Sequence, residues 1–300
     1  MEEKYYHVYQ RSVDGGVIFY TTEDCLLFYT VLSLISAKYK IVVLAVAIMP
    51  NHIHLLVRAK NIVALRRFVS AYTSRFTVLY NEAYDREGHL FSAPFGKSEK
   101  YGTKRIRTCL SYIYNNPVEK KISSSVESSI WNFLSYAGSP FPFSPKLVIR
   151  NASWQMRKAI KECRYMFSSR QPIQPVFLAR LFKKLIPNEQ NQLRDYIIGL
   201  YKFIRHDKAI SFYGSYETMV LAANSNTGSE YEIEEEFYKG SDAVYADMTS
   251  ELMKTGLVDF PAKVANLSIE VKRRLLWVLR MKTTATDSQI ARFLHLPREK

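Results

Sequence analysis

The pattern of apolar and polar positions in the first part of the chain predicts one helix among several strands. Residues 5–11 alternate as a half-buried strand does, and a turn at 14–16 leads from them into a short apolar segment at 17–20. Residues 21–37 open with hydroxyl and acidic side chains, the signature of a helix start, and continue largely apolar. Two further apolar runs, at 40–47 and 50–58, predict adjacent strands of one sheet.

Helical periodicity dominates the next stretch of the chain. Apolar residues recur at helical spacing over 61–80, and a third helix is predicted over 103–115. Pro117 should end that helix, because the residue before a proline avoids the helical conformation. Residues 88–97 form a loop or a further strand. The order strand, helix, strand, strand, helix, strand predicts an α+β fold, a ferredoxin-like (RRM-like) domain with an antiparallel sheet and helices on one face.

The second half of the chain is mainly helical in its pattern. Proline-rich residues 139–150 read as a linker between a domain at 1–138 and a helical domain at 151–300. Within that domain, residues 269–300 combine a basic amphipathic helix with the first helix and turn of a helix-turn-helix. The recognition helix would begin only at Pro297, so the motif is either partial or a chance pattern.

Charge favours a polyanionic partner. The net charge is +14, and residues 58–121 alone hold 13 Lys and Arg against five Asp and Glu, which favours a phosphate-bearing ligand. The longest apolar run, residues 41–49, is too short to span a bilayer, and the acidic start is not typical of a signal peptide. We therefore expect no membrane partner and a cytoplasmic, nucleoid-associated protein.

Candidate chemistry begins with two histidines in the predicted strand at 50–58. His52 and His54 are separated by one residue, so both point to the same side of a strand, about 7 Å apart. Two neutral imidazoles at this spacing can bind one divalent metal if a third ligand arrives from elsewhere. The alternative is ordinary hydrogen-bonded packing, which the spacing alone does not exclude.

A tyrosine and an asparagine in the third predicted helix extend this chemistry. Tyr112 and Asn116 are four residues apart, so they share one helix face with Cβ atoms about 6 Å apart. The tyrosine oxygen could attack a phosphate while the amide oxygen binds metal. Tyr114 is a competing nucleophile on another face of the helix, and among 21 tyrosines a helical tyrosine is also simply unremarkable.

Three motifs together resemble the single-tyrosine HUH transposases, and in particular the REP-associated tyrosine transposases. They are MPNHIHLLV at 49–57, YIYNNPV at 112–118 and WNFLSY at 131–136. The resemblance covers about residues 1–138. Asn115 departs from it, because the family more often has an apolar residue there, and the long helical extension is a second departure.

The resemblance implies a nuclease and strand-transfer activity on single-stranded, hairpin-forming DNA. It implies that His52 and His54 bind Mg²⁺ or Mn²⁺, that Asn116 completes the metal site, and that Tyr112 attacks a phosphate to give a 5′-phosphotyrosine. Basic side chains on the two helices are then expected to contact the DNA backbone: Arg66, Arg67, Arg75, Lys104, Arg105 and Arg107.

Two other functions stay open at this point. A nucleic-acid-binding regulator would keep the sheet and the basic faces and bind without cleaving. A metal-dependent hydrolase would use the histidine pair and a water, and would not need Tyr112. A homodimer is an open alternative to a monomer.

Overall fold

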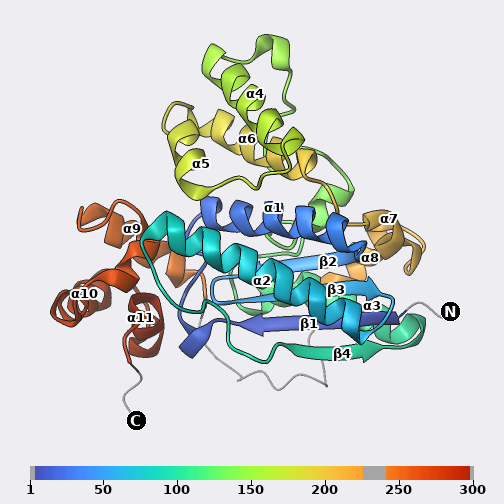
Figure 1. Cartoon of the computed structure of the whole chain (residues 1–300), viewed down its shortest axis with the longest axis horizontal. Coiled ribbons are helices and arrows are strands. Elements are labelled where there is room, and N and C mark those ends of the chain that lie inside the picture. Colours follow the sequence, from blue (N-terminus) through green and yellow to red (C-terminus); the bar gives the residue numbers. More distant parts are fainter. Residues whose placement is uncertain (1–3, 226–240, 298–300) are drawn as a thin grey trace.

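A computed structural model describes residues 4–225 and 241–297. An antiparallel sheet with strand order β2-β3-β1-β4 forms its centre (Figure 1). Its strands are β1 Lys4–Arg11, β2 Val42–Met49, β3 His52–Ala59 and β4 Gly96–Lys100. The helices that cover it are α1 Thr22–Tyr39, α2 Ile62–Tyr84 and α3 Gly102–Glu119. This order and topology are those of a split βαβ unit, so the predicted α+β fold is confirmed.

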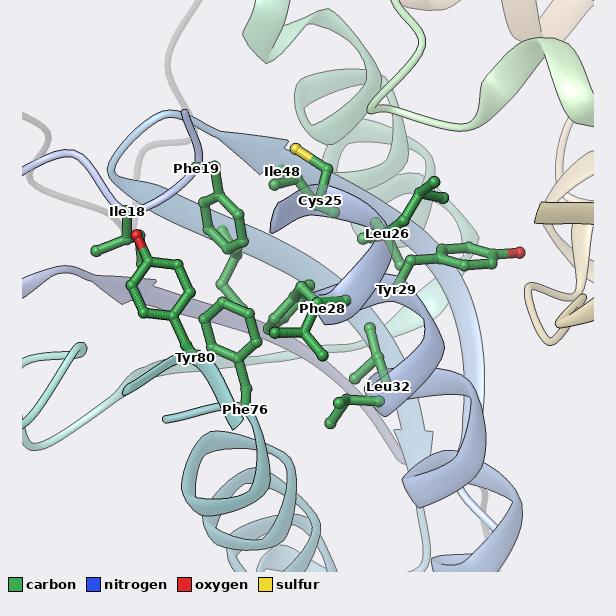
Figure 2. Close-up of a cluster of buried hydrophobic side chains, with 14 of the residues drawn as sticks. Ile18, Phe19, Cys25, Leu26, Phe28, Tyr29, Leu32, Ile48, Phe76 and Tyr80 are labelled. Carbon is green, nitrogen blue, oxygen red and sulfur yellow. The ribbon is translucent and has the colours of Figure 1, made fainter. Parts of the chain in front are cut away.

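The two faces of the sheet pack against different helices. Along β3, Ile53 and Leu55 join the core with α1 and α2, whereas Leu56 joins a second core under α3. Helices therefore lie on both faces, since α3 covers the face opposite the one predicted to hold all of them. The larger core is aromatic, and Figure 2 shows Phe28 of α1 beside Phe76 of α2, with ring centroids 5.2 Å apart.

The segment at residues 17–20 is extended but is not a strand. The N–H groups of Ile18 and Phe19 both donate to the carbonyl of Pro50, at 2.9 and 3.0 Å. The N–H of Val17 donates to the carbonyl of Arg292 at 3.2 Å. The partners of this segment are a turn and a distant helix, which the hydrophobic pattern does not reveal.

Helix α3 runs past the predicted stop and contains Pro117. Proline lacks an N–H, so it leaves the carbonyl four residues earlier without its helical donor, but it does not prevent the next turn. The N–H of Lys120 still donates to the carbonyl of Asn116 at 3.0 Å. The buried Asn132 amide also donates to the carbonyl of Tyr114 at 2.9 Å, which attaches the 131–136 motif to this end of α3.

The remaining helices form three groups around the sheet domain. Those over α1 are α4 Trp154–Ser168, α5 Pro175–Phe182 and α6 Pro187–Leu200. Those beside β2 and α3 are α7 His206–Ser211 and α8 Tyr216–Asn224. The last group is α9 Val244–Lys254, α10 Ile269–Lys282 and α11 Asp287–Leu294. Short 3-10 turns are η1 Val13–Gly15, η2 Leu134–Ala137, η3 Ile149–Asn151 and η4 Pro261–Asn266. No helix within the described ranges is long and apolar enough to cross a membrane.

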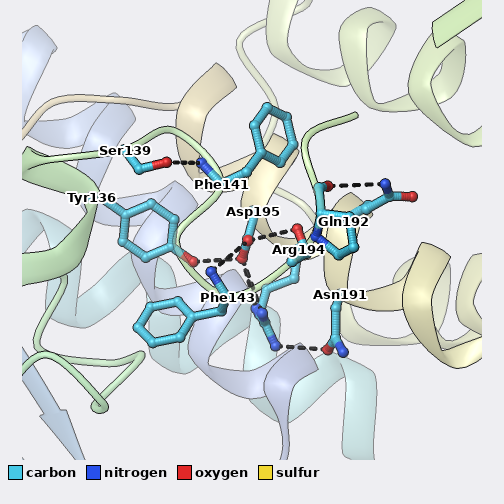
Figure 3. Close-up of polar contacts among 10 residues, drawn as sticks. Tyr136, Ser139, Phe141, Phe143, Asn191, Gln192, Arg194 and Asp195 are labelled. Atoms are coloured by element: carbon cyan, nitrogen blue, oxygen red, sulfur yellow. Dashed lines mark hydrogen bonds and ion pairs between the residues drawn. The ribbon is translucent and has the colours of Figure 1, made fainter. Parts of the chain in front are cut away.

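The buried Asp195 carboxylate of α6 binds the proline-rich segment. The Asp195 carboxylate accepts hydrogen bonds from the Tyr136 hydroxyl and the Ser144 hydroxyl, both at 2.8 Å (Figure 3). The Arg194 guanidinium lies 3.0 Å from the same carboxylate. Both charged side chains are buried, so the segment is held by charge-assisted hydrogen bonds rather than by regular structure.

The last described helix returns to the start of α1. The Tyr20 hydroxyl donates to the carbonyl of Phe293 at 2.8 Å, and His295 Nε2 lies 2.9 Å from the carbonyl oxygen of Val17. Helix α11 begins with a capping box between Thr286 and Gln289. The predicted recognition helix would begin at Pro297, and its remaining residues, 298–300, lie outside the described residues.

Candidate active site

The histidine pair lies on the face of the sheet that α3 covers. Both side chains point to that face, as strand alternation requires, and their ring centroids are 5.1 Å apart. His54 is buried under α3, whereas His52 is half-buried at the end of β3. The Nδ1 of His52 lies 2.8 Å from the Asn51 side-chain oxygen, a contact that favours the tautomer with the hydrogen on Nδ1 and the lone pair on Nε2.

A third histidine that sequence reasoning missed belongs to the same cluster. His7 of β1 is fully buried, and its Nε2 lies 3.1 Å from Nδ1 of His54. One signal could have found it, because a split βαβ sheet places the first strand directly beside the strand that carries His52 and His54. The hydrogen bond fixes the orientation of the His54 ring.

Tyr112 and Asn116 of α3 face these histidines. The Asn116 amide donates to the Tyr112 hydroxyl at 3.3 Å, and the Tyr112 ring centroid lies 5.3 Å from that of His54. Tyr112 is only 1% exposed. The competing candidate Tyr114 points elsewhere, because its hydroxyl donates to the carbonyl of Leu44 in β2 at 3.3 Å, and burial raises its pKa. Of the two candidate nucleophiles, the structure therefore brings Tyr112, and not Tyr114, to the histidines.

The side chains of His52 and Asn116 fit a shared cation. The Asn116 amide oxygen lies 3.4 Å from Nε2 of His52, so a carbonyl oxygen faces a nitrogen lone pair. Two ligands bound at about 2.1 Å, roughly 90–110° from each other, lie about 3.0–3.4 Å apart, which matches this spacing. Within the part of the chain that is described, no group of three or more His, Cys, Asp or Glu could hold a metal. A metal site here thus depends on the amide of Asn116.

Tyr9 closes one side of the cluster. It lies directly opposite His54 on β3 and Gly96 on β4 in the sheet register. Its ring stacks with that of His54 at a centroid distance of 6.4 Å. It also covers Gly96 so closely that a Cβ built there would lie 1.9 Å from the ring. Gly96 is therefore required by space, because the aromatic ring occupies the place of its side chain.

A cleft of about 430 Å³ opens beside the exposed edge of His52. Basic side chains from three separate segments line it, together with two acids: Arg11, Lys120, Arg292, Asp14 and Asp242. The cleft reaches His52 but does not include Tyr112, which lies beneath α3. Its size and mixed charge suit a phosphate-bearing group next to the histidine pair.

The six predicted DNA contacts are all exposed, but the sheet separates them into two sets. Arg66, Arg67 and Arg75 lie on the outer face of α2, on the side of the sheet away from the histidines. The other three are on the first turns of α3, at the histidine face: Lys104, Arg105 and Arg107. The Arg107 guanidinium lies 4.9 Å from the Tyr213 ring centroid. The structure therefore does not bring the six into one surface.

Fold and site together define an α+β domain in which a histidine pair on a central strand faces a tyrosine on a helix. Residues 5–116 match the family model described as Transposase IS200 like, in agreement with the resemblance that the motifs indicated. The chain is also similar to a solved structure described as a REP-associated tyrosine transposase bound to a REP hairpin. That match has a TM-score of 0.35 and 15% identity, over 46% of this chain and 79% of the other. No curated protein matches the chain.

Proposed function

We propose that this protein cleaves and rejoins single-stranded DNA through Tyr112, acting on hairpin-flanked strands. One observation carries the proposal. The Tyr112 hydroxyl is hydrogen-bonded to the Asn116 amide, whose oxygen faces Nε2 of His52. A potential nucleophile and the predicted metal ligands are thus held in one cluster next to a cleft lined by three basic and two acidic side chains.

The proposed reaction conserves the energy of the phosphodiester. The Tyr112 oxygen attacks phosphorus, the bond from phosphorus to the 3′ oxygen breaks, and the proton that the tyrosine loses ends on that 3′ oxygen. The products are a 5′-phosphotyrosine and a free 3′-hydroxyl. Attack by a 3′-hydroxyl on the phosphotyrosine reverses these steps and joins two strands.

The chain's own side chains have separate tasks in this scheme. His52, His54 and Asn116 would hold Mg²⁺ or Mn²⁺, which as a Lewis acid offsets charge on the phosphate oxygens. His7 orients His54 through their hydrogen bond, and the Asn116 amide orients the Tyr112 hydroxyl. Because Tyr112 is buried, we propose that the end of α3 shifts when a strand enters the cleft.

The test is formation of a covalent protein–DNA adduct. Wild-type protein and Tyr112→Phe are incubated with labelled hairpin DNA and Mn²⁺ and run on a denaturing gel. We expect an adduct that Tyr112→Phe abolishes. Tyr114→Phe is the matched control on the same helix and should keep the adduct, because the Tyr114 hydroxyl bonds to Leu44. An adduct that persists without the Tyr112 hydroxyl would exclude this mechanism.

A second function is supported by the burial of Tyr112. The Tyr112 side chain, on the sheet-facing side of α3, is only 1% exposed, so DNA cannot reach it in this conformation. Such burial is also consistent with a regulator that binds nucleic acid and no longer cuts it. This alternative predicts tight metal-independent binding and no adduct across a broad pool of hairpins. The same gel, run beside a binding assay, separates the two functions.

A further inference from the structure

A strongly basic surface lies far from the candidate active site. Residues 146–184 contain ten Lys and Arg and a single acid, Glu162. That acid is already bound by Arg180, at 2.7 Å. Much of the segment forms α4 and α5, which lie beyond α1 on the side of the molecule away from α3 (Figure 1). The surplus positive charge therefore belongs to a surface other than the cleft at His52.

Exposed aromatic rings interrupt this charge on one face of α4. Trp154, Lys158, Lys161 and Tyr165 follow one another at intervals of four, three and four residues, which places them on a single helix face. Trp154 is 64% exposed and Tyr165 is 68% exposed. The Lys158 ammonium lies 5.3 Å from the Trp154 ring centroid. We call these four residues the α4 stripe.

The α4 stripe borders a groove of about 790 Å³. The other side chains that line the groove are Arg157, Glu162, Met166 and Phe177, the last of which comes from α5. Large exposed rings beside a hollow cost free energy in water, which indicates that a ligand covers them. The surrounding cations specify an anionic ligand, and the flat rings specify one with faces that stack.

We infer that this groove binds single-stranded nucleic acid. Trp154 and Tyr165 are separated by eleven residues, or about 16 Å along the helix, the length of roughly five bases stacked at 3.4 Å. Bases stack on the two rings while Lys158 and Lys161 contact phosphates between them. An acidic protein surface would satisfy the lysines but would leave the exposed rings without a matching partner.

This second site does not depend on the chemistry proposed for Tyr112. The groove lies beyond the α1 layer, and the histidines lie on the far face of the sheet. With packed layers about 10 Å apart, the two sites are roughly 20–30 Å from each other. A short oligonucleotide that fills the cleft therefore cannot also fill the groove, whereas a longer strand can reach both.

The experiment measures binding by the full chain carrying Tyr112→Phe, so that no cleavage occurs. The probe is a fluorescent single-stranded oligothymidine of about 30 nucleotides, followed by anisotropy at about 0.1 M salt. We expect Trp154→Ala with Tyr165→Ala to weaken binding at least about tenfold, and the corresponding pair of Phe substitutions to retain it. Lys158→Gln with Lys161→Gln should weaken binding and flatten its salt dependence.

Trp277→Ala is the matched control. Trp277 on α10 is 63% exposed and has a cation, Arg280, 5.1 Å from its ring, but that arginine is bound by Asp287. Equal losses in this control and in the α4 stripe would overturn the proposal, as would unchanged binding in the Ala pair. Displacement of the probe by polyglutamate as readily as by unlabelled oligothymidine would show an acidic-polymer site instead.

A second measurement, adduct formation, distinguishes this proposal from the proposed function. With Tyr112 intact, the α4 stripe variants should still form the covalent adduct with a short hairpin. If wild-type protein forms no adduct, strand transfer is refuted. The groove proposal is then still tested by the anisotropy measurement alone.

Discussion

The candidate site depends on a pair of buried histidines that are not neighbours in sequence. His7 holds the ring of His54 through a 3.1 Å hydrogen bond from the adjacent strand. Residues that orient a metal ligand from behind typically change metal affinity or activity by about 10–100-fold when removed. His7 is therefore a positioning residue in the proposed mechanism.

Replacing His7 by leucine should raise the Mn²⁺ concentration needed for adduct formation by about 10–100-fold. The reason is that His54 loses the partner that fixes its ring. The measurement is the rate of adduct formation against Mn²⁺ concentration. His89→Leu, at an exposed histidine in the loop before β4, is the control and should leave the curve in place. An unchanged Mn²⁺ dependence in His7→Leu would remove His7 from the site.

A second single-residue prediction concerns the substitution Gly96→Ala. A Cβ there would lie 1.9 Å from the ring of Tyr9, so Gly96→Ala must displace that ring from its place beside His54. Overpacking of this kind costs about 1–3 kcal/mol, and adduct formation should fall with it. Urea unfolding measures the first effect. Gly199→Ala in α6, where nothing lies within 4 Å, should instead leave stability unchanged or raise it.

Between elements, Asp195 of α6 binds Ser144 of the proline-rich segment and is paired with its buried neighbour Arg194. Removing one partner of a buried ion pair leaves the other charge unpaired, which costs about 3–5 kcal/mol. Asp195→Ala should therefore lower the free energy of unfolding by about that amount. The exposed ion pair of Arg205 and Asp207 provides the control. Asp207→Ala should lower the free energy of unfolding by under about 1 kcal/mol. Similar decreases in unfolding free energy for the two variants would show that the buried pair stabilises the fold no more than the exposed pair does.

Sequence periodicity predicted most of the sheet domain, because its strands and its first two helices each bury one face against a shared core. It could not place residues 17–20, whose hydrogen-bond partners are the Pro50 turn and Arg292 of α11. It also ended α3 too early, because Pro117 costs the helix a single donor and the N–H of Lys120 still bonds the carbonyl of Asn116. Contacts that depend on distant segments leave no local pattern.

The candidate site was likewise predicted only in part from the sequence. Strand alternation and helical spacing grouped His52 with His54 and Tyr112 with Asn116, and the structure brings the two pairs together. His7 lies in a strand whose pattern shows only alternation, so its role depends on sheet order. The division into domains at residues 139–150 stays a prediction.

At the scale of the whole molecule, one continuous cluster of buried apolar side chains reaches from Tyr6 in β1 to Leu294 in α11. Two histidines with lowered pKa values make stability depend on pH. Burial, with a smaller contribution from Arg86 and Lys272, lowers the pKa of His295 to about 4. Burial also lowers the pKa of His206 to about 4.

These shifts predict a loss of stability on mild acidification. A histidine whose pKa is lower in the folded state stabilises fully above its unfolded pKa of about 6.5 and loses that contribution as pH falls toward 4. From pH 7 to pH 5 the loss is about 2 kcal/mol per histidine. Asp24 acts in the opposite direction, because burial raises its pKa to about 7 and its stabilising contribution fades as pH rises.

The His295 contribution can be isolated with His295→Asn, since asparagine tolerates the left-handed backbone at this position, where φ is 52°. The difference in unfolding free energy between pH 7 and pH 5 should be smaller in this variant by about 2 kcal/mol than in the wild type. Comparing the two proteins cancels the effects of Asp24 and His206. An identical pH difference in both proteins would contradict the assignment.

The contact of Tyr20 with Phe293 and His295 has a consequence for how the chain is made. The residues that lead into α1 are completed by a helix translated 273 positions later. At roughly 5–20 residues per second, a ribosome needs about 15–55 s to supply it. Throughout that time the nascent sheet domain exposes the apolar margin that α11 will cover. Folding of this protein should therefore be more sensitive to slow synthesis, to chaperone binding and to premature termination. The comparison is with a protein whose first domain buries its apolar surface without a later segment.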